Sequence, residues 1–288
     1  MILLLIAALV IPLGLDLYLS VPEANPMTAE TVELGRRWFN DRRLSRDGTI
    51  ACASCHDPAR AFSKSDPIAI GVFGRHGRRN APAIVNRGYG RLFFWDGRAP
   101  TLEAQVLMPI QDPNEMDLTL EEASARVGID QRSISDALAS YVRSILSGNA
   151  PYDRFVNGDR TALSPAQQAG LEIFRGKGNC TACHVGPTFS DERLHNTGVA
   201  WQNGHLLDAG AGHGDFKTPT LREVARTSPY MHDGSLPTLE AVVDFYSDGG
   251  RPNPWMDPEI HPLHLSPTEK QAVIAFLQSL SGTITEGQ

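Results

Sequence analysis

The stretch Cys52-Ala53-Ser54-Cys55-His56 recurs as Cys180-Thr181-Ala182-Cys183-His184, and the two stretches hold all four cysteines of the 288-residue chain. The pattern Cys-x-x-Cys-His is the attachment signature of c-type haem. Two thiols at this spacing can reach the two vinyl groups on one edge of a porphyrin, and the next residue brings its imidazole to the iron. We therefore predict two covalent haems, attached through Cys52, Cys55, Cys180 and Cys183, with His56 and His184 as proximal ligands.

Paired cysteines have three other common uses in proteins. The two pairs could bind one zinc ion, but a zinc site does not need a histidine directly after each pair, and its pairs usually lie closer together. They could be redox dithiols, but no βαβ pattern surrounds them. They could form structural disulfides, but a two-residue gap makes a poor cross-link. Haem attachment is the reading that explains both histidines.

The composition is that of an ordinary globular protein. Hydrophobic residues make up 41% of the chain, and 26 glycines and 20 prolines indicate many loops. The formal net charge is −7, which argues against nucleic acid as a partner.

The N-terminus begins MILLLIAALVIPLGL and carries no lysine or arginine before Arg36. We read residues 1–22 as a signal peptide or an N-terminal membrane anchor, although a basic n-region is missing and Asp16 interrupts the apolar run. Bacterial c-type haem is attached outside the cytoplasm, so the chain must be exported. We expect a periplasmic protein, with a membrane-tethered form as the alternative.

Helical patterns appear in the same order in both halves of the chain. The expected helices cover residues 28–40, a segment from about Leu120, residues 133–145, 164–176, 238–246 and 266–280. Residues 57–100 show little periodicity and are expected to form ordered loops, and residues 147–161 carry the composition of a linker. No strand-rich region stands out. The expected fold is all-α, with two cytochrome c-like domains at 28–148 and 160–284, each holding one haem, joined by a short linker.

Several further motifs lie between and after the haem motifs. In order they are Arg79-Asn80-Ala81-Pro82, Phe94-Trp95-Asp96-Gly97-Arg98, Leu102-Glu103-Ala104-Gln105, Pro113-Asn114-Glu115-Met116, Phe216-Lys217-Thr218-Pro219-Thr220-Leu221-Arg222 and Ser228-Pro229-Tyr230-Met231-His232-Asp233-Gly234. With these motifs the chain resembles the bacterial di-haem cytochrome c peroxidase family, including its MauG-type branch. The resemblance runs from about Glu33 to Leu280.

The resemblance implies a role for each haem and for several side chains. The haem of His56 would react with peroxide, and the haem of His184 would transfer electrons. Glu115 and Gln105 would form the distal pair beside the first haem, where a carboxylate can move a proton and an amide can orient bound peroxide. Trp95 would lie between the haems. Taken alone, Glu115 and Gln105 read as exposed side chains and Trp95 as a core residue.

The resemblance also implies a Ca²⁺ site at the domain interface. Asn80 would bind the ion together with the backbone carbonyls of Thr227 and Pro229. Ca²⁺ requires several oxygen ligands, of which these are only some. Without the resemblance, Asn80 reads as a turn residue before Ala-Pro.

The sixth ligands depart from the pattern of the family's peroxidases. His76 stands nearer to Asn80 than the family's loop ligand does, so we expect a solvated loop histidine and an open first haem. At the second haem, where the peroxidases use methionine, this chain has Tyr246, as the MauG branch does. A phenolate would stabilise ferric iron. Met231 and Met256 are the rival ligands, and Met231 suits core packing better.

Three functions follow from these patterns. The first is reduction of hydrogen peroxide to water with electrons from cytochrome c or another small redox protein. The second is a MauG-type reaction, in which peroxide is used to oxidise residues of a protein substrate. The third, a plain electron carrier, leaves Glu115 and Gln105 without a role. Dimerisation is common in the family, so a homodimer is also an expectation.

Overall fold

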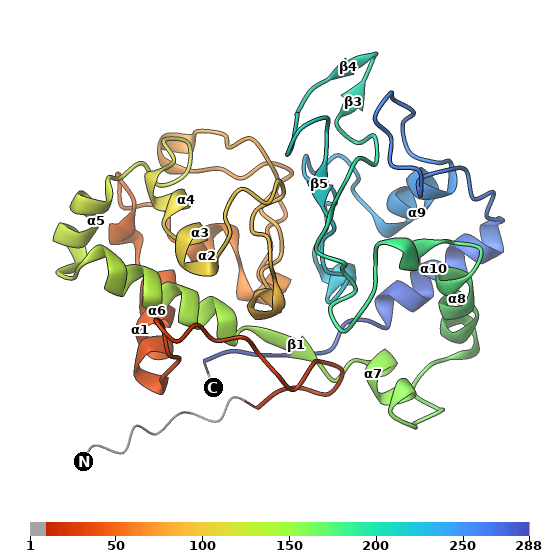
Figure 1. Cartoon of the computed structure of the whole chain (residues 1–288), viewed down its shortest axis with the longest axis horizontal. Coiled ribbons are helices and arrows are strands. Elements are labelled where there is room, and N and C mark those ends of the chain that lie inside the picture. The colour runs from red at the N-terminus through yellow and green to blue at the C-terminus, as the bar shows by residue number, and fades with distance from the viewer. Residues whose placement is uncertain (1–9, 288) are drawn as a thin grey trace.

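The computed structural model describes residues 10–287 and divides into two lobes that meet along a seam (Figure 1). The first lobe carries α1 to α6, and the second carries α8 to α10 with most of the short strands. Each lobe has its own cluster of buried apolar side chains. The regular secondary structure of the described chain is mostly helical, as expected, and its strands are only two or three residues long.

The bounds of the helices and strands are as follows. The helices are α1 Ala29–Phe39, α2 Cys52–Cys55, α3 Leu102–Gln105, α4 Met108–Gln111, α5 Leu120–Val127, α6 Gln131–Ser144, α7 Pro151–Val156, α8 Pro165–Arg175, α9 Leu239–Ser247 and α10 Pro267–Gln278. The strands are β1 Leu146–Gly148, β2 Leu194–His195, β3 Trp201–Gln202, β4 His205–Leu206, β5 Phe216–Lys217 and β6 Thr283–Thr285, which pair as β1–β6, β2–β5 and β3–β4.

Two helices cross at very short range in the first lobe. Helix α1 begins after Thr28, whose hydroxyl accepts a hydrogen bond from the Thr31 nitrogen at 3.1 Å. It crosses α6 at Gly35, where an added Cβ would lie 1.9 Å from the main-chain oxygen of Ala137 and 2.8 Å from the Cβ of Tyr141. Only glycine permits this approach.

The second lobe repeats this crossing with α8 and α10. A Cβ on Gly170 would lie 1.9 Å from the Ala272 oxygen and 2.9 Å from the Cβ of Phe276. Gly170, Ala272 and Phe276 have the same mutual spacing in sequence as Gly35, Ala137 and Tyr141. The repeated order of helices expected from the sequence therefore corresponds to a repeated packing arrangement.

Most helix predictions are confirmed, with small differences at their ends. All four expected N-cap side chains accept a hydrogen bond from the backbone nitrogen of the third helical residue. They are Thr28, Ser164, Thr238 and Ser266. Helix α6 begins earlier than expected, because Asp130 caps it by accepting from the Ser133 nitrogen at 3.0 Å. Helices α3 and α4 were not expected. They are single turns, too short to show a period.

The stretch read as a linker, residues 147–161, is partly structured. It contains the end of β1 and the whole of α7, in which Asp153 is fully buried and pairs with Arg222 at 2.7 Å. Strand β1 pairs with β6 near the C-terminus, so the end of the chain returns to the first lobe (Figure 1). A buried ion pair and a strand pair distinguish this segment from a free linker.

Part of the apolar N-terminal segment contacts both lobes. The main-chain oxygen of Leu13 accepts from the Asn149 nitrogen at 2.7 Å, that of Gly14 from Arg222 at 3.0 Å, and that of Asp16 from the Tyr89 hydroxyl at 2.7 Å. The remainder of the predicted leader, residues 1–9, lies outside the described residues. Among residues 10–287, no helix combines the length and apolar character needed to span a bilayer.

Candidate functional site: a cavity shared by two haem motifs

One continuous cavity runs through the seam and is lined by residues of both Cys-x-x-Cys-His motifs. Its volume is about 530 Å³, and Cys55, His56, Cys180, Cys183 and His184 contribute to its wall. Apolar walls with a few convergent polar groups are typical of cofactor sites. The cavity therefore brings together the two motifs that the sequence places far apart.

In the first motif, His56 follows the single-turn helix α2. Its Nδ1 lies 3.3 Å from the main-chain oxygen of Phe62, which adopts a left-handed conformation with φ 58°. Burial lowers the pKa of His56, so the ring is held neutral. A neutral imidazole with Nδ1 engaged to a carbonyl leaves Nε2 free to bind iron.

The second motif has the same arrangement. Nδ1 of His184 lies 2.8 Å from the main-chain oxygen of Phe189, whose φ is 53°. Burial lowers the pKa of His184 to about 4. In both motifs, then, a neutral, oriented imidazole and at least one thiol (Cys55 in the first, Cys180 and Cys183 in the second) face one cavity, and this donor set fits a c-type haem.

The alternatives for the cysteines do not fit. All four thiols are free. Among the described residues, the one group of three potential ligand atoms within 4.8 Å of one another is Cys183, Asp191 and His195. It contains a single cysteine, so the two pairs do not come together as one zinc site.

Glu115 is the one strongly perturbed carboxyl group of the cavity wall. Burial, and to a lesser extent the negative charge of Asp112, raise its pKa to about 7. Among the described residues its carboxylate makes no side-chain hydrogen bond, while Gln105, at the end of α3, lines the same cavity. A carboxyl group that titrates near pH 7 can accept a proton and return it.

Trp95 lies at the seam, in the cavity wall. Its indole nitrogen donates to the main-chain oxygen of Asn80 at 2.9 Å, and its own main-chain oxygen accepts from the Lys217 nitrogen at 2.7 Å. The first bond stays within the first lobe and the second crosses to the other lobe. Trp95 is therefore fixed by both lobes.

Of the three candidate ligands for the second haem, Tyr246 and Met231 line the cavity and Met256 does not. Tyr246 lies on α9 in the wall that also contains Cys180 and Cys183, and burial raises its pKa to about 12. The sulfur of Met256 instead lies 3.5 Å from Nδ2 of Asn253. The structure thus leaves Tyr246 and Met231 as geometric candidates.

His76 is exposed and does not contribute to the cavity wall. It lies in a loop held by a bridge between Ile70 and His76. This position agrees with the expectation of a solvated loop histidine.

The residues expected to bind calcium all belong to the cavity wall. Asn80, Thr227 and Pro229 line it. The Asn80 amide donates to the main-chain oxygens of Asp66 at 3.1 Å and Pro67 at 3.2 Å, which leaves its Oδ1 as an acceptor. The side chain of Asn80 is thus oriented by the first lobe and lies at the seam.

Two groups of charged residues, one of them joining the lobes, were not predicted from the sequence. Arg87 forms a two-point ion pair with Glu192 across the lobes, and Nζ of the buried Lys217 lies 3.6 Å from the same carboxylate. His195 lies between two carboxylates, with Nδ1 2.6 Å from Asp257 and Nε2 2.9 Å from Asp191. Arg87 and Glu192 are 105 residues apart and His195 and Asp257 are 62 apart, so no local pattern identifies these two pairings.

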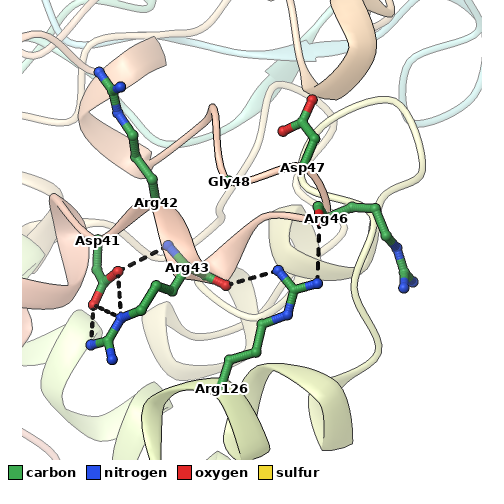
Figure 2. Close-up of a pocket in the computed structure, with 7 residues that line it drawn as sticks. All are labelled: Asp41, Arg42, Arg43, Arg46, Asp47, Gly48 and Arg126. Carbon is green, nitrogen blue, oxygen red and sulfur yellow. Dashed lines mark hydrogen bonds and ion pairs between the residues drawn. The ribbon is translucent and has the colours of Figure 1, made fainter.

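A second depression lies on the first lobe, and none of its lining residues belongs to a haem motif. Its wall consists of Asp41, Arg42, Arg43, Arg46, Asp47, Gly48 and Arg126 (Figure 2). The Arg126 guanidinium donates to the main-chain oxygens of Arg43 at 3.3 Å and Arg46 at 3.2 Å, and Arg43 pairs with Asp41 at 2.6 Å. These arginines hold a loop, and the depression contains none of the site residues expected from the sequence.

Comparison with known proteins gives consistent matches. The family described as di-haem cytochrome c peroxidase matches residues 29–161. The methylamine utilization protein MauG of Methylorubrum extorquens is 38% identical over 287 residues, covering 90% of this chain and 80% of that protein. The cytochrome-c peroxidase IdrP2 of Denitromonas iodatirespirans is 38% identical over 315 residues, covering 91% and 84%. A crystal structure of a MauG-like protein associated with microbial copper homeostasis has a TM-score of 0.82 at 33% identity, covering 91% and 92%.

Proposed function

Because the chain belongs to the di-haem cytochrome c peroxidase family, whose relatives include MauG proteins, we propose that it is an oxidoreductase that reduces hydrogen peroxide to water. Two protons and two electrons are consumed for each peroxide, and the electrons come from a small donor such as cytochrome c. The observation that carries this proposal is the buried Glu115, whose pKa is raised to about 7 in the cavity wall. A carboxyl group placed there suits proton transfer to peroxide.

We assign one haem to each lobe, within the ranges 28–148 and 160–284. Cys52, Cys55 and His56 hold the first, and Cys180, Cys183 and His184 hold the second. Haem supplies an iron centre that binds peroxide and exchanges single electrons. Because c-type haem is attached after export, the protein is assigned to the periplasm.

Glu115 and Gln105 act on the peroxide in this proposal. Ionised Glu115 takes a proton from the peroxide oxygen that will stay behind and gives it to the oxygen that will leave as water. Gln105 does not titrate, so its amide orients the peroxide throughout. The exposed position of His76 supports a first haem that is open without prior reduction.

Trp95 carries electrons between the lobes. Its polarisable ring lies at the seam, and two hydrogen bonds fix it there. Electrons that enter at the second haem would pass this ring on the way to the first.

The second candidate function is a MauG-type oxidation of residues in a protein substrate. The observation that favours it is Tyr246 in the wall of the second haem site. A phenolate ligand would stabilise the oxidised iron and allow the second haem to hold an oxidising equivalent. The electrons for peroxide would then come from aromatic side chains of the substrate.

We also propose a Ca²⁺ ion at the seam, bound by Oδ1 of Asn80 and the carbonyls of Thr227 and Pro229, with water completing its shell. The free Oδ1 of Asn80 supports this proposal. Calorimetric titration of chelator-treated protein should show one Ca²⁺ site in the wild type and a much weaker one in Asn80→Ala. Equal affinity in the two proteins would remove the assignment.

The deciding experiment is peroxide-dependent oxidation of ferrocytochrome c by the haem-loaded, fully oxidised protein. Fast turnover without pre-reduction is the expected result for a peroxidase with an open first haem. If turnover is slow while peroxide still changes the haem spectrum, the donor is different and the MauG-type function is favoured. If peroxide leaves the spectrum unchanged, both functions are excluded.

A further inference from the structure

Two turns, one in each lobe, have the same backbone conformation. In the first, Phe93 bridges Ala99, and Phe94 and Gly97 have φ values of 66° and 69°. In the second, Tyr230 bridges Leu236, and the corresponding φ values, at Met231 and Gly234, are 75° and 63°. Each turn leads to a threonine-capped helix, α3 after Thr101 and α9 after Thr238.

Trp95 and His232 occupy equivalent positions in these two turns. Each stands directly before an Asp-Gly pair, Asp96-Gly97 in one turn and Asp233-Gly234 in the other. Both side chains line the cavity that the two haem motifs share. The family resemblance implies that Trp95 lies between the haems, and the internal repeat makes His232 its counterpart.

The two residues also make the same bond across the seam. The main-chain oxygen of Trp95 accepts from the Lys217 nitrogen of the second lobe at 2.7 Å, and the main-chain oxygen of His232 accepts from the Asn80 nitrogen of the first lobe at 2.7 Å. Each turn is therefore held by the opposite lobe. These two reciprocal hydrogen bonds fix Trp95 and His232 relative to each other.

The side chain of His232 is buried and has an unused hydrogen-bonding capacity. The residue is 4% exposed, and its ring stacks on Phe216 with centroids 3.7 Å apart and planes 13° apart. The Arg79 guanidinium covers Phe216 at 5.2 Å. Among the described residues, neither imidazole nitrogen has a hydrogen-bond partner, whereas the Trp95 indole nitrogen is bonded to Asn80. His232 lines the cavity, so an imidazole N–H without a protein partner is available to donate to a group bound there.

We propose that His232 is the second half of the electron bridge between the haems, and that its imidazole N–H donates to a haem propionate. The proposal rests on the two-haem function above. A propionate is the anionic part of haem, and a bond from a buried donor to a charged acceptor is among the stronger hydrogen bonds. One electron crosses per step, and no bond is made or broken in the bridge.

Two variants separate the two parts of this role. His232→Phe keeps a ring on Phe216 and removes the N–H, whereas His232→Gln keeps an N–H and removes the ring. His76→Phe is the matched control, because His76 is exposed and outside the cavity wall. The haem-loaded full chain is reduced photochemically by one electron without peroxide, and absorbance follows electron exchange between the haems. Potentiometric titration gives each reduction potential.

His232→Phe is expected to lower the reduction potential of one haem, because loss of a donor leaves more negative charge near the iron. The shift should correspond to a change of about tenfold in the equilibrium constant for reduction of that haem. His232→Gln should keep that potential and slow the exchange. If His232→Phe has the reduction potentials of the wild type, the proposed hydrogen bond to the propionate is overturned. If His232→Gln exchanges electrons between the haems at the wild-type rate, the role of His232 in the electron bridge is overturned. If His232→Phe fails to retain haem, His232→Ser is measured in its place, with and without added imidazole. Reduction potentials that are the same with and without imidazole would overturn the proposed hydrogen bond to the propionate. Absence of a c-type haem spectrum in the wild type would instead refute the proposed function.

Discussion

Arg87 and Glu192 join the lobes by two hydrogen bonds, of 2.7 and 3.0 Å, in a pair whose side chains are only 11% and 9% exposed. Removing Arg87 leaves the Glu192 carboxylate in a region of low water content with only Lys217, at 3.6 Å, as a cationic partner. We expect Arg87→Met to lower the free energy of unfolding by about 3 kcal/mol. Urea denaturation measures this, with Arg36→Met as the control, because the Arg36–Glu33 pair is exposed and should contribute less than about 1 kcal/mol.

The same pair predicts a pH dependence of stability. Burial alone would raise the pKa of Glu192, but the hydrogen bonds and charge of Arg87, together with the charge of Lys217, lower it from 4.5 to about 2. A carboxylate with a depressed pKa in the folded state contributes stability above its unfolded pKa and loses it as the pH falls. Wild-type stability should therefore decline between about pH 4.5 and pH 2. A decline of equal size in Arg87→Met would contradict this assignment.

Glu115 should control the pH dependence of the reaction with peroxide. Because its pKa is raised from 4.5 to about 7, the ionised base is present above that pH, and kcat/KM for peroxide should rise through about pH 7. Glu115→Gln should remove this step and slow the reaction by about 100-fold or more. Asp112→Asn removes a neighbouring negative charge, so the midpoint should move to lower pH. An unchanged profile in Glu115→Gln would exclude Glu115 as the base.

Tyr246 can be tested as a ligand by spectroscopy. Its phenol is neutral before iron binds, since burial raises its pKa to about 12, and binding to ferric iron would displace that proton. Tyr246→Met should therefore change the ferric spectrum of the second haem. Met256→Leu is the matched control, because Met256 lies outside the cavity wall. If Tyr246→Met keeps the wild-type spectrum and Met231→Leu alters it, the ligand is Met231.

The helix crossings predict a strict requirement for glycine. Gly35→Ala would place a Cβ 1.9 Å from the Ala137 oxygen, so the helices must move apart. We expect a loss of about 1–3 kcal/mol in the free energy of unfolding, and the same for Gly170→Ala. Thermal denaturation of the full chain measures the loss. Glu30→Ala, an exposed change on the same helix, should cost about 0.5 kcal/mol or less.

The sequence could predict those parts of the structure that depend on residues close together in the chain. Caps such as Thr28 and Ser266 act within four residues of the helix they begin, and each Cys-x-x-Cys-His motif is contiguous. Helices α3 and α4 are single turns, so they show no period, and α7 lies in a stretch whose composition indicates a linker. Local patterns could not reveal them.

The residues missed at the site depend on contacts between distant segments. Lys217 and Trp95 meet only because the two lobes face each other, and Arg87 finds Glu192 across the same seam. His232 could have been found from the sequence by aligning its Asp-Gly turn with that of Trp95. That comparison requires recognising the repeat within the chain, since neither turn alone indicates a bridge.

Strand β6 gives the final residues of the chain a role in the first lobe. Ile284 packs against the first lobe's core, Glu286 bonds the hydroxyl of Tyr141, and the Gly287 nitrogen donates to Ser144 at 3.0 Å. A premature stop codon or a protease cut just before Thr283 would therefore damage the half of the molecule made first and leave the α8–α10 half largely intact. During synthesis, the lobe that carries the first haem motif cannot be completed until residues 283–287 have emerged.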